Sequence, residues 1–185
     1  MSILVEHTRQ KHREVEEHPL VQLMINGEIT KPQYISFLKQ FYYIYSAIEY
    51  YAEMAGLLND LVDIKRAEYI KEDLKELGCT DFELTNVQQL PSVKKYVEHI
   101  RDLYYGKDMI KVLAHVYVRH MGDMYGGKLI ARQVPGSGRC YQFVDKAAVV
   151  RALNNKLTLD LVNEALFAFD CSASVFDDLM ESFNE

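Results

Sequence analysis

Apolar residues recur at intervals of three and four along nearly the whole chain, and the alternation typical of β-strands is almost absent. This spacing gives successive α-helices one apolar face each. Capping residues, prolines and glycines then set the ends of the helices. They predict helices over residues 2–17, 19–25, 31–58, 63–77, 93–106, 109–133, 144–156 and 158–183. Residues 79–91 lack the pattern and are predicted to be mostly irregular.

Several of these helix starts have a recognisable N-cap. Thr30 followed by Gln33 has the spacing of a capping box, which predicts that Thr30 begins a long aromatic-rich helix. Ser92 and Asp108 are predicted N-caps of two later helices. The pattern therefore predicts an all-α, compact single-domain bundle of seven to nine helices.

Length and composition exclude several classes of protein. The 185 residues, 49% hydrophobic and 26% charged, form one predicted globular domain, 1–185. A net charge of −6 argues against non-specific nucleic-acid binding. No apolar run reaches the roughly 20 residues of a membrane span, and no signal peptide is evident, so we expect a cytoplasmic protein without a membrane anchor, with the plastid stroma also compatible. Three widely spaced cysteines argue against a disulfide framework and a thiolate metal site.

The segment G-D-M-Y-G-G-K, residues 122–128, places three glycines inside a predicted helix. Each interior glycine costs a helix about 1 kcal/mol relative to alanine. Glycines that share one helical face let a flat or bulky group reach the backbone. The alternative is that Gly122 ends one helix and the other glycines allow tight helix packing. The density of polar residues nearby favours a functional site; these are His115, Tyr117, Arg119, His120 and Asp123. An ordinary surface salt bridge would equally explain Arg119 and Asp123, which are four residues apart.

Residues 113–130, L-A-H-V-Y-V-R-H-M-G-D-M-Y-G-G-K-L-I, resemble the distal-helix signature of heme oxygenases in order and spacing. In that family the glycines let a kinked helix lie almost on the heme face, and the aspartate orders a water network beside bound oxygen. The resemblance implies that three residues contact heme or its oxygen: Gly122, Gly126 and Gly127. It also implies that Asp123 holds the water, with Arg119 and Tyr117 supporting the network.

A second matching segment lies near the N-terminus. His12 has Glu16 at i+4, where a carboxylate can accept a hydrogen bond from one ring nitrogen and fix the orientation of a metal-bound histidine. The family's proximal histidine has the same H-x-x-x-E pattern, followed fifteen residues later by a glycine, here Gly27. The spacing fits neither His7 nor His18. The resemblance therefore implies that His12 is the axial ligand of the heme iron.

The third matching segment is F-Y-Y-I-Y-S-A-I-E, residues 41–49, which resembles the family's tyrosine-bearing pocket helix. It implies that Tyr45 joins the distal hydrogen-bond network. The neighbouring tyrosines are interpreted as core residues: Tyr42, Tyr43, Tyr50 and Tyr51. Together the three segments imply the heme oxygenase fold, with heme sandwiched between a proximal N-terminal helix and the glycine-rich distal helix.

The resemblance implies that heme b is both cofactor and substrate, and that O2 and reducing equivalents convert it to biliverdin, carbon monoxide and ferrous iron. The implied electron donor is a ferredoxin or a flavin reductase. Four basic residues are candidates for docking an acidic donor: Lys11, Arg13, Lys128 and Arg132. Arg9 and Arg151 match basic positions that hold the heme propionates. A lysine usual in the family falls on Ala147, with Lys146 next to it.

Two residues depart from the family pattern. Tyr125 replaces a small residue, and its phenol either adds a hydrogen bond to the distal water network or points outward. His120 replaces a common aromatic residue. Neither change removes a residue that the implied chemistry requires.

Two alternatives remain open. A heme-binding sensor or carrier would also need His12, although storage alone does not require Asp123 and the glycines. A non-heme, thiaminase-like member of the same helical superfamily would need a cysteine nucleophile, for which Cys171 is the candidate. A ferritin-like di-iron site is excluded because no glutamate has a histidine three residues after it.

Overall fold

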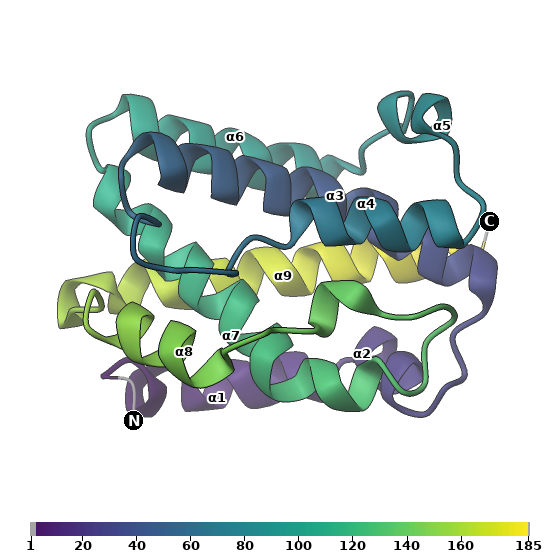
Figure 1. Cartoon of the computed structure of the whole chain (residues 1–185), viewed down its shortest axis with the longest axis horizontal. Helices are drawn as coiled ribbons and strands as arrows, with labels where there is room; N and C mark the ends of the chain where they lie inside the picture. Colours follow the sequence, from purple (N-terminus) through teal and green to yellow (C-terminus); the bar gives the residue numbers. More distant parts are fainter. Residues whose placement is uncertain (1–2, 185) are drawn as a thin grey trace.

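The computed structural model describes residues 3–184, and every regular element in that range is helical (Figure 1). The all-α prediction is confirmed. The α-helices are α1 Val5–Glu16, α2 Pro19–Ile25, α3 Lys31–Met54, α4 Ala67–Glu76, α5 Asp81–Thr85, α6 Pro91–Tyr105, α7 Val112–Ile130, α8 Lys146–Asn154 and α9 Val162–Ser182. Three short 3-10 turns are η1 Met109–Lys111, η2 Arg139–Tyr141 and η3 Leu159–Leu161. Ser2, the predicted start of the first helix, lies outside the described residues.

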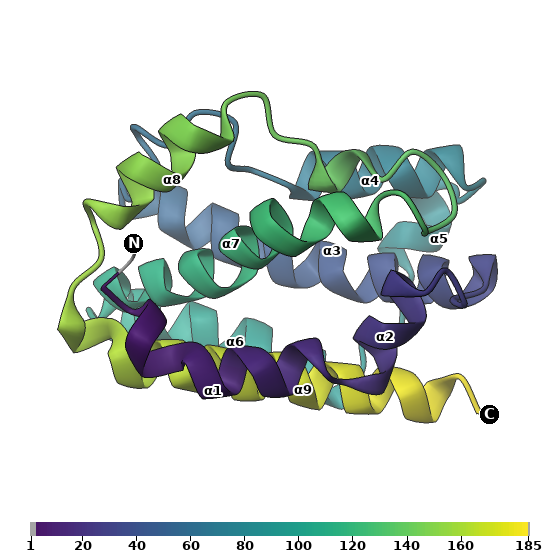
Figure 2. The same cartoon turned by 90° about the horizontal axis from the view of Figure 1, so that it is seen from below.

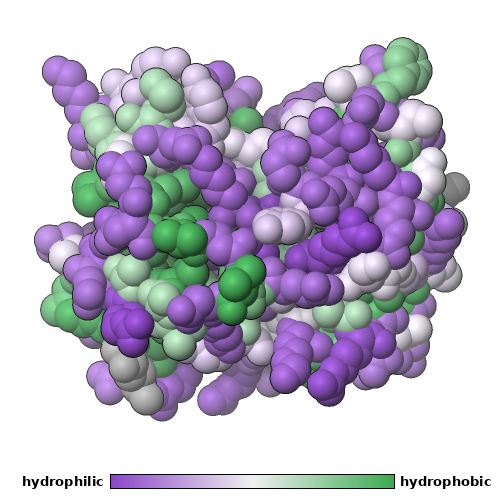
Figure 3. All heavy atoms as spheres, viewed as in Figure 1, coloured by the Kyte–Doolittle hydropathy of each residue, from purple (hydrophilic) through white to green (hydrophobic). Residues whose placement is uncertain are grey.

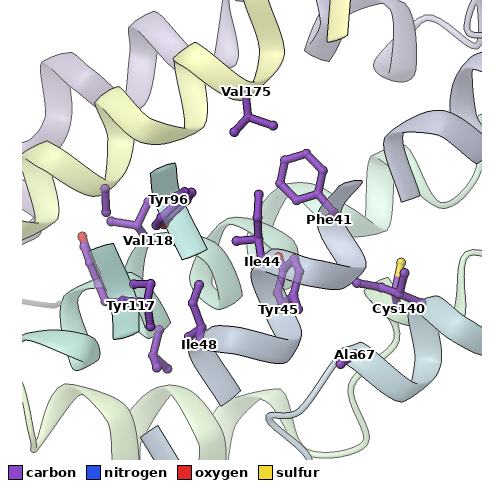
Figure 4. Packing of buried hydrophobic residues seen from close by; sticks show 14 of the residues in the cluster. Phe41, Ile44, Tyr45, Ile48, Ala67, Tyr96, Tyr117, Val118, Cys140 and Val175 are labelled. Atoms are coloured by element: carbon purple, nitrogen blue, oxygen red, sulfur yellow. The ribbon is translucent and has the colours of Figure 1, made fainter. Parts of the chain in front are cut away.

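Helix α7, which carries the glycine segment, lies at the centre of the bundle. It packs against α3 on one side and α9 on another, while α1 lies along α9 (Figures 1 and 2). Side chains from these helices meet in the core, among them Phe41, Val118 and Val175 (Figure 4). Because α7 has neighbours on most sides, its apolar residues are spread around the helix and do not form a single stripe. Figure 3 shows that the outer face is mostly hydrophilic, with apolar side chains gathered toward the left of the view.

The two capping boxes of the chain show how far local sequence fixes the helix starts. At Thr30 the prediction is confirmed: its hydroxyl accepts from Gln33 N at 3.4 Å, and Gln33 Oε1 accepts from Thr30 N at 2.9 Å. Thr80 and Glu83 form the same motif and begin α5, inside the segment predicted to be irregular. Most of that segment is irregular as predicted, but the five-residue helix α5 was missed because its capping box was not recognised.

Other helix boundaries also differ from the prediction. Helix α3 ends at Met54, four residues early, and α6 begins at Pro91 after the N-cap Leu90. The predicted cap Ser92 is instead inside α6, and its backbone N–H donates to Asp178 Oδ2 of α9 at 2.9 Å. Asp108 precedes the turn η1 without a side-chain cap.

Helix α4 begins four residues later than predicted, at Ala67 and not at residue 63. Asp63 has a left-handed backbone with φ 61°, which ends any helix through this position. The fully buried Arg66 stabilises the connection between α3 and α4. Its side chain donates to three carbonyl oxygens, those of Ile64, Asp63 and Gln142. Its guanidinium also lies over the Phe143 ring, 4.0 Å from the centroid. A buried cation therefore fixes the approach to α4.

Replacing this cation tests that interpretation. Arg66→Met is expected to lower the free energy of unfolding by about 3–5 kcal/mol, because it leaves buried carbonyls without their donor and removes the cation paired with Asp63. Lys65→Met is the matched control, since Lys65 pairs with Glu53 at the surface and its loss should cost no more than about 1 kcal/mol. Urea unfolding of both variants measures the difference, and equal values would refute the role of Arg66.

Candidate active site

Two adjoining cavities, each of about 220 Å³, lie between α1, α7 and α9. They share part of their lining: His12, Val118, Gly122, Tyr125 and Phe169. Together they fall within the size range of small-molecule and cofactor sites, roughly 300–1,000 Å³. The lining is mainly apolar, with a few polar groups on α1 and α7. This arrangement suits a flat, largely apolar ligand.

His12 lies on the α1 wall of both cavities. Its Nδ1 is 3.2 Å from Glu16 Oε2, so the predicted i+4 pair is formed. The ring edge packs against Phe169 of α9, with 6.0 Å between ring centroids. The carboxylate beside Nδ1 favours the tautomer that carries the proton on Nδ1 and the lone pair on Nε2. Nε2 has no hydrogen-bond partner in residues 3–184, which leaves it available to a metal.

The glycines of α7 divide into two groups. The helix continues through Gly122, so the interpretation that Gly122 ends a helix was wrong. A Cβ added at Gly122 or Gly126 would meet nothing within 4 Å, and both residues line the cavity opposite His12. A Cβ at Gly127 would lie 2.6 Å from Tyr141 Cδ1. The third glycine therefore makes room for the Tyr141 ring, and it lines neither cavity, so its predicted heme contact stays a prediction that this position does not support.

Alanine at two successive positions separates these roles. Gly127→Ala is expected to destabilise the fold by about 1–3 kcal/mol, because the Tyr141 ring must move. Gly126→Ala should instead raise the free energy of unfolding by up to about 1 kcal/mol through helix propensity. Only Gly126→Ala places a methyl group in the cavity, so it should weaken hemin binding more than Gly127→Ala does. Urea unfolding and hemin titration measure both effects; the opposite order would contradict the assignment.

Asp123 and Tyr45 form the polar centre of the distal wall. Tyr45 of α3 donates a short hydrogen bond to Asp123 Oδ2, across 78 residues of sequence. Burial raises the pKa of Asp123, while the Arg119 guanidinium and the Tyr45 hydrogen bond offset part of that rise. Burial also raises the pKa of Tyr45 well above its ordinary value, so the phenol remains a donor. Asp123 Oδ1 is therefore the oxygen left for a further partner.

Arg119 lies beside this pair and lines the cavity. Its guanidinium stacks on Phe41, 4.6 Å from the ring centroid, and its Nη1 is 3.4 Å from Ser172 Oγ. Burial opposes its charge, but Tyr45 and Asp123 hold the pKa of Arg119 above its ordinary value. The buried Nε makes no hydrogen bond within residues 3–184. Arg119 thus supplies a fixed positive charge and a spare donor near the cavity.

Tyr117 lines one cavity beside Thr8 and Arg9 of α1, and Tyr125 lines both cavities. The Tyr117 hydroxyl is 3.4 Å from Thr8 Oγ1 of α1. Tyr125 is 60% exposed, and Lys146 of α8 lies over its ring, 3.8 Å from the centroid. Tyr125 therefore stands at the cavity mouth with a cation beside it.

The predicted basic residues surround the mouth on two sides. Arg9 of α1 lines one cavity and is exposed, with no ion pair in the described part of the chain. Arg151 and Lys146 of α8 line a neighbouring depression that also includes Tyr125. Lys11 Nζ forms an ion pair with Asp170 Oδ1 at 2.8 Å. The other predicted docking residues are exposed: Arg13, Lys128 and Arg132.

His120 has a structural explanation. The residue is fully buried, and its Nε2 lies 3.3 Å from Glu49 Oε1. The same Glu49 carboxylate accepts the backbone N–H groups of Arg66 and Ala67 at the start of α4. His120 therefore joins α7 to the cap of another helix. Nothing in the local sequence marks Glu49 or Phe169, because each is one of many residues at helical spacing.

A family model described as heme oxygenase matches residues 2–165. The chain belongs to the heme oxygenase family. It is 29% identical to heme oxygenase 2 of Macaca fascicularis over 96% of this chain, and it spans 64% of that relative's length. The solved heme oxygenase of Leptospira interrogans is 26% identical, with a TM-score of 0.78 over 95% of this chain and 98% of that one. Heme oxygenase-1 of Synechocystis, solved in complex with heme, has a TM-score of 0.80 at 21% identity and covers 98% of this chain and 94% of its own.

Family membership disfavours the thiaminase-like alternative, and so does Cys171. Burial raises the pKa of the Cys171 thiol to about 12, and Asp170 and Glu164 add to the rise. A thiol held in that state is a poor nucleophile. Among the described helices of this heme oxygenase family member, none is long and apolar enough to cross a membrane.

Proposed function

We propose that this protein binds heme b between α1 and α7 and oxidatively cleaves it to biliverdin, releasing carbon monoxide and ferrous iron. The observation that carries the proposal is the pairing of His12, with Nε2 unengaged, and the side-chain-free surface at Gly122 and Gly126 across one cavity. The residues present fit the ligand, since the cavity offers an imidazole on one wall and bare backbone on the other. Heme, once bound, would supply both the redox-active iron and the ring that is oxidised.

On the proximal side, His12 would hold the iron through Nε2. Glu16, 3.2 Å from Nδ1, favours the tautomer that presents the Nε2 lone pair, and it would strengthen the ligand. Phe169 restricts rotation of the ring. In cysteine-ligated heme enzymes the electron-donating thiolate favours O–O cleavage. A neutral histidine ligand would not have this effect.

On the distal side, Asp123 would hold a water molecule through Oδ1 while Tyr45 fixes its other oxygen. Because burial raises the pKa of Asp123, this carboxyl is better suited to exchange protons near neutral pH than an exposed aspartate. Arg119 balances the buried negative charge of Asp123. Asp123 would thus hold or release a proton at Oδ1 and pass it through a water molecule toward the cavity.

Cations at the mouth would orient the ring. Arg9 lies beside the α1 wall, and Arg151 and Lys146 lie on α8. Lys146 occupies the position next to Ala147 and would replace the family's usual lysine as a propionate partner. The exposed Arg13, Lys128 and Arg132 would help an acidic electron donor, a ferredoxin or a flavin reductase, to dock.

A hemin titration followed by turnover tests the function. Hemin should give a Soret band with one-to-one stoichiometry, and a reductant with oxygen should then remove that band and produce bilin absorbance. A stable Soret band without bilin formation would indicate a carrier or sensor. Absence of hemin binding would refute both interpretations.

A further inference from the structure

A second cluster of metal-binding side chains lies where α6, α7 and α9 meet. His99 of α6 and His115 of α7 both direct Nε2 at Glu164 of α9, at 2.6 and 3.0 Å from the same Oε1. One ligand atom from each residue lies within 4.8 Å of the others. None of these residues lines either heme-site cavity. The cluster is therefore a separate feature of the fold.

The cluster is held in place by its surroundings. His115 is fully buried, and its Nδ1 lies 3.1 Å from the hydroxyl of Tyr96. A hydrogen bond at the second ring nitrogen is the usual partner of a metal-bound histidine, because it fixes ring orientation and tautomer. The His99 ring packs on Phe167, with 4.5 Å between centroids, and its side chain is 30% exposed. His99 thus offers an entry path from solvent.

We propose that His99, His115 and Glu164 bind a divalent first-row transition metal ion, for which Zn²⁺ is the simplest representative. Two imidazoles and a carboxylate are the ligand set that such ions accept, with water completing a four-coordinate site. Bonds of about 2.0–2.2 Å imply ligand atoms roughly 3.3–3.5 Å apart, so Glu164 must withdraw slightly to admit the ion. The metal ion takes the place of the two protons that lie between the histidine Nε2 atoms and Glu164 Oε1.

The proton balance of this step is simple. Each neutral imidazole transfers its proton from Nε2 to Nδ1, exchanging through solvent, so that Nε2 presents a lone pair to the ion. At His115 the new Nδ1–H donates to the Tyr96 hydroxyl, which is already within reach. Glu164 Oε1 already accepts from both Nε2 atoms, so it supplies the carboxylate ligand. Binding therefore requires no oxidant, reductant or net loss of a proton from neutral histidines.

Titration of the chelator-treated, heme-free protein with Zn²⁺ tests the site by calorimetry. One ion should bind per chain, and the thermal unfolding midpoint should rise with Zn²⁺ concentration. His99→Ala should weaken binding at least about 10-fold and abolish most of the thermal shift. His99 is partly exposed, so this variant should fold, which circular dichroism checks. The matched control His7→Ala removes an exposed histidine of α1 and should leave binding unchanged.

Two results would overturn the proposal. The first is Zn²⁺ affinity that is the same in the wild type and in His99→Ala. The second is loss of binding in His12→Ala but not in His99→Ala, which would place the ion at the proximal histidine. Neither readout depends on heme turnover, so the outcome is independent of the proposed oxygenase activity.

Discussion

Replacing His12 by alanine is expected to reduce biliverdin formation by more than about 100-fold. Losing a residue that only hydrogen-bonds to a metal ligand already costs up to about 100-fold, and this substitution removes the ligand itself. The substitution removes the imidazole whose Nε2 faces the cavity. Hemin should still enter, because the apolar lining and the glycine surface of α7 remain, but the Soret band should shift as the axial ligand is lost. Absorption spectra and bilin yield measure the two effects.

Exogenous imidazole provides the sharper part of this experiment. A small ligand that occupies the space left in His12→Ala should restore the spectrum of the wild-type complex and part of the turnover. His7→Ala is the matched control, since His7 is exposed on the same helix and does not line the cavity. Full turnover in His12→Ala without imidazole would contradict the proximal role.

Replacing Asp123 should separate heme binding from heme cleavage. In Asp123→Asn the amide oxygen can still accept from Tyr45, so the fold and hemin affinity should stay near those of the wild type. The amide cannot exchange a proton as the carboxyl does, and biliverdin formation should fall by about 100-fold or more. Asp123→Ala should lose turnover to a similar extent while retaining a Soret band.

Single-turnover assays with hemin already bound measure the Asp123 effect directly. The control is Asp160→Asn, which removes an exposed carboxylate far along the sequence from the distal pair. Unchanged biliverdin yield in Asp123→Ala would show that the carboxylate does not guide proton delivery. A parallel loss of hemin affinity would instead indicate a structural role.

The sequence predicts helices well wherever the signal is local. The Thr30–Gln33 capping box and the apolar spacing of α3 are both properties of neighbouring residues. Errors arise where distant residues fix a boundary. Ser92 does not cap α6, whose second residue it is, and Asp178 of α9 reaches its backbone N–H. Likewise α4 begins late because a buried Arg66 holds the preceding connection, a fact that no local pattern shows.

The same distinction applies to the site. His12 and Glu16 are one helical turn apart, so their pairing follows from spacing alone. The contact between Tyr45 and Asp123 joins residues 78 apart in sequence, and it was expected only from the family resemblance. Gly127 shows the limit of prediction from local sequence. The residue that requires a glycine at this position, Tyr141, lies in a turn later in the chain. Adjacent glycines with different roles are indistinguishable until the helix has neighbours.

A crystal structure of the ferric hemin complex tests the account most directly. We expect the iron to be bound by Nε2 of His12, and the main chain at Gly122 and Gly126 to lie against the opposite face of the porphyrin. Iron bound by any other residue, or a porphyrin outside the space between α1 and α7, would contradict it.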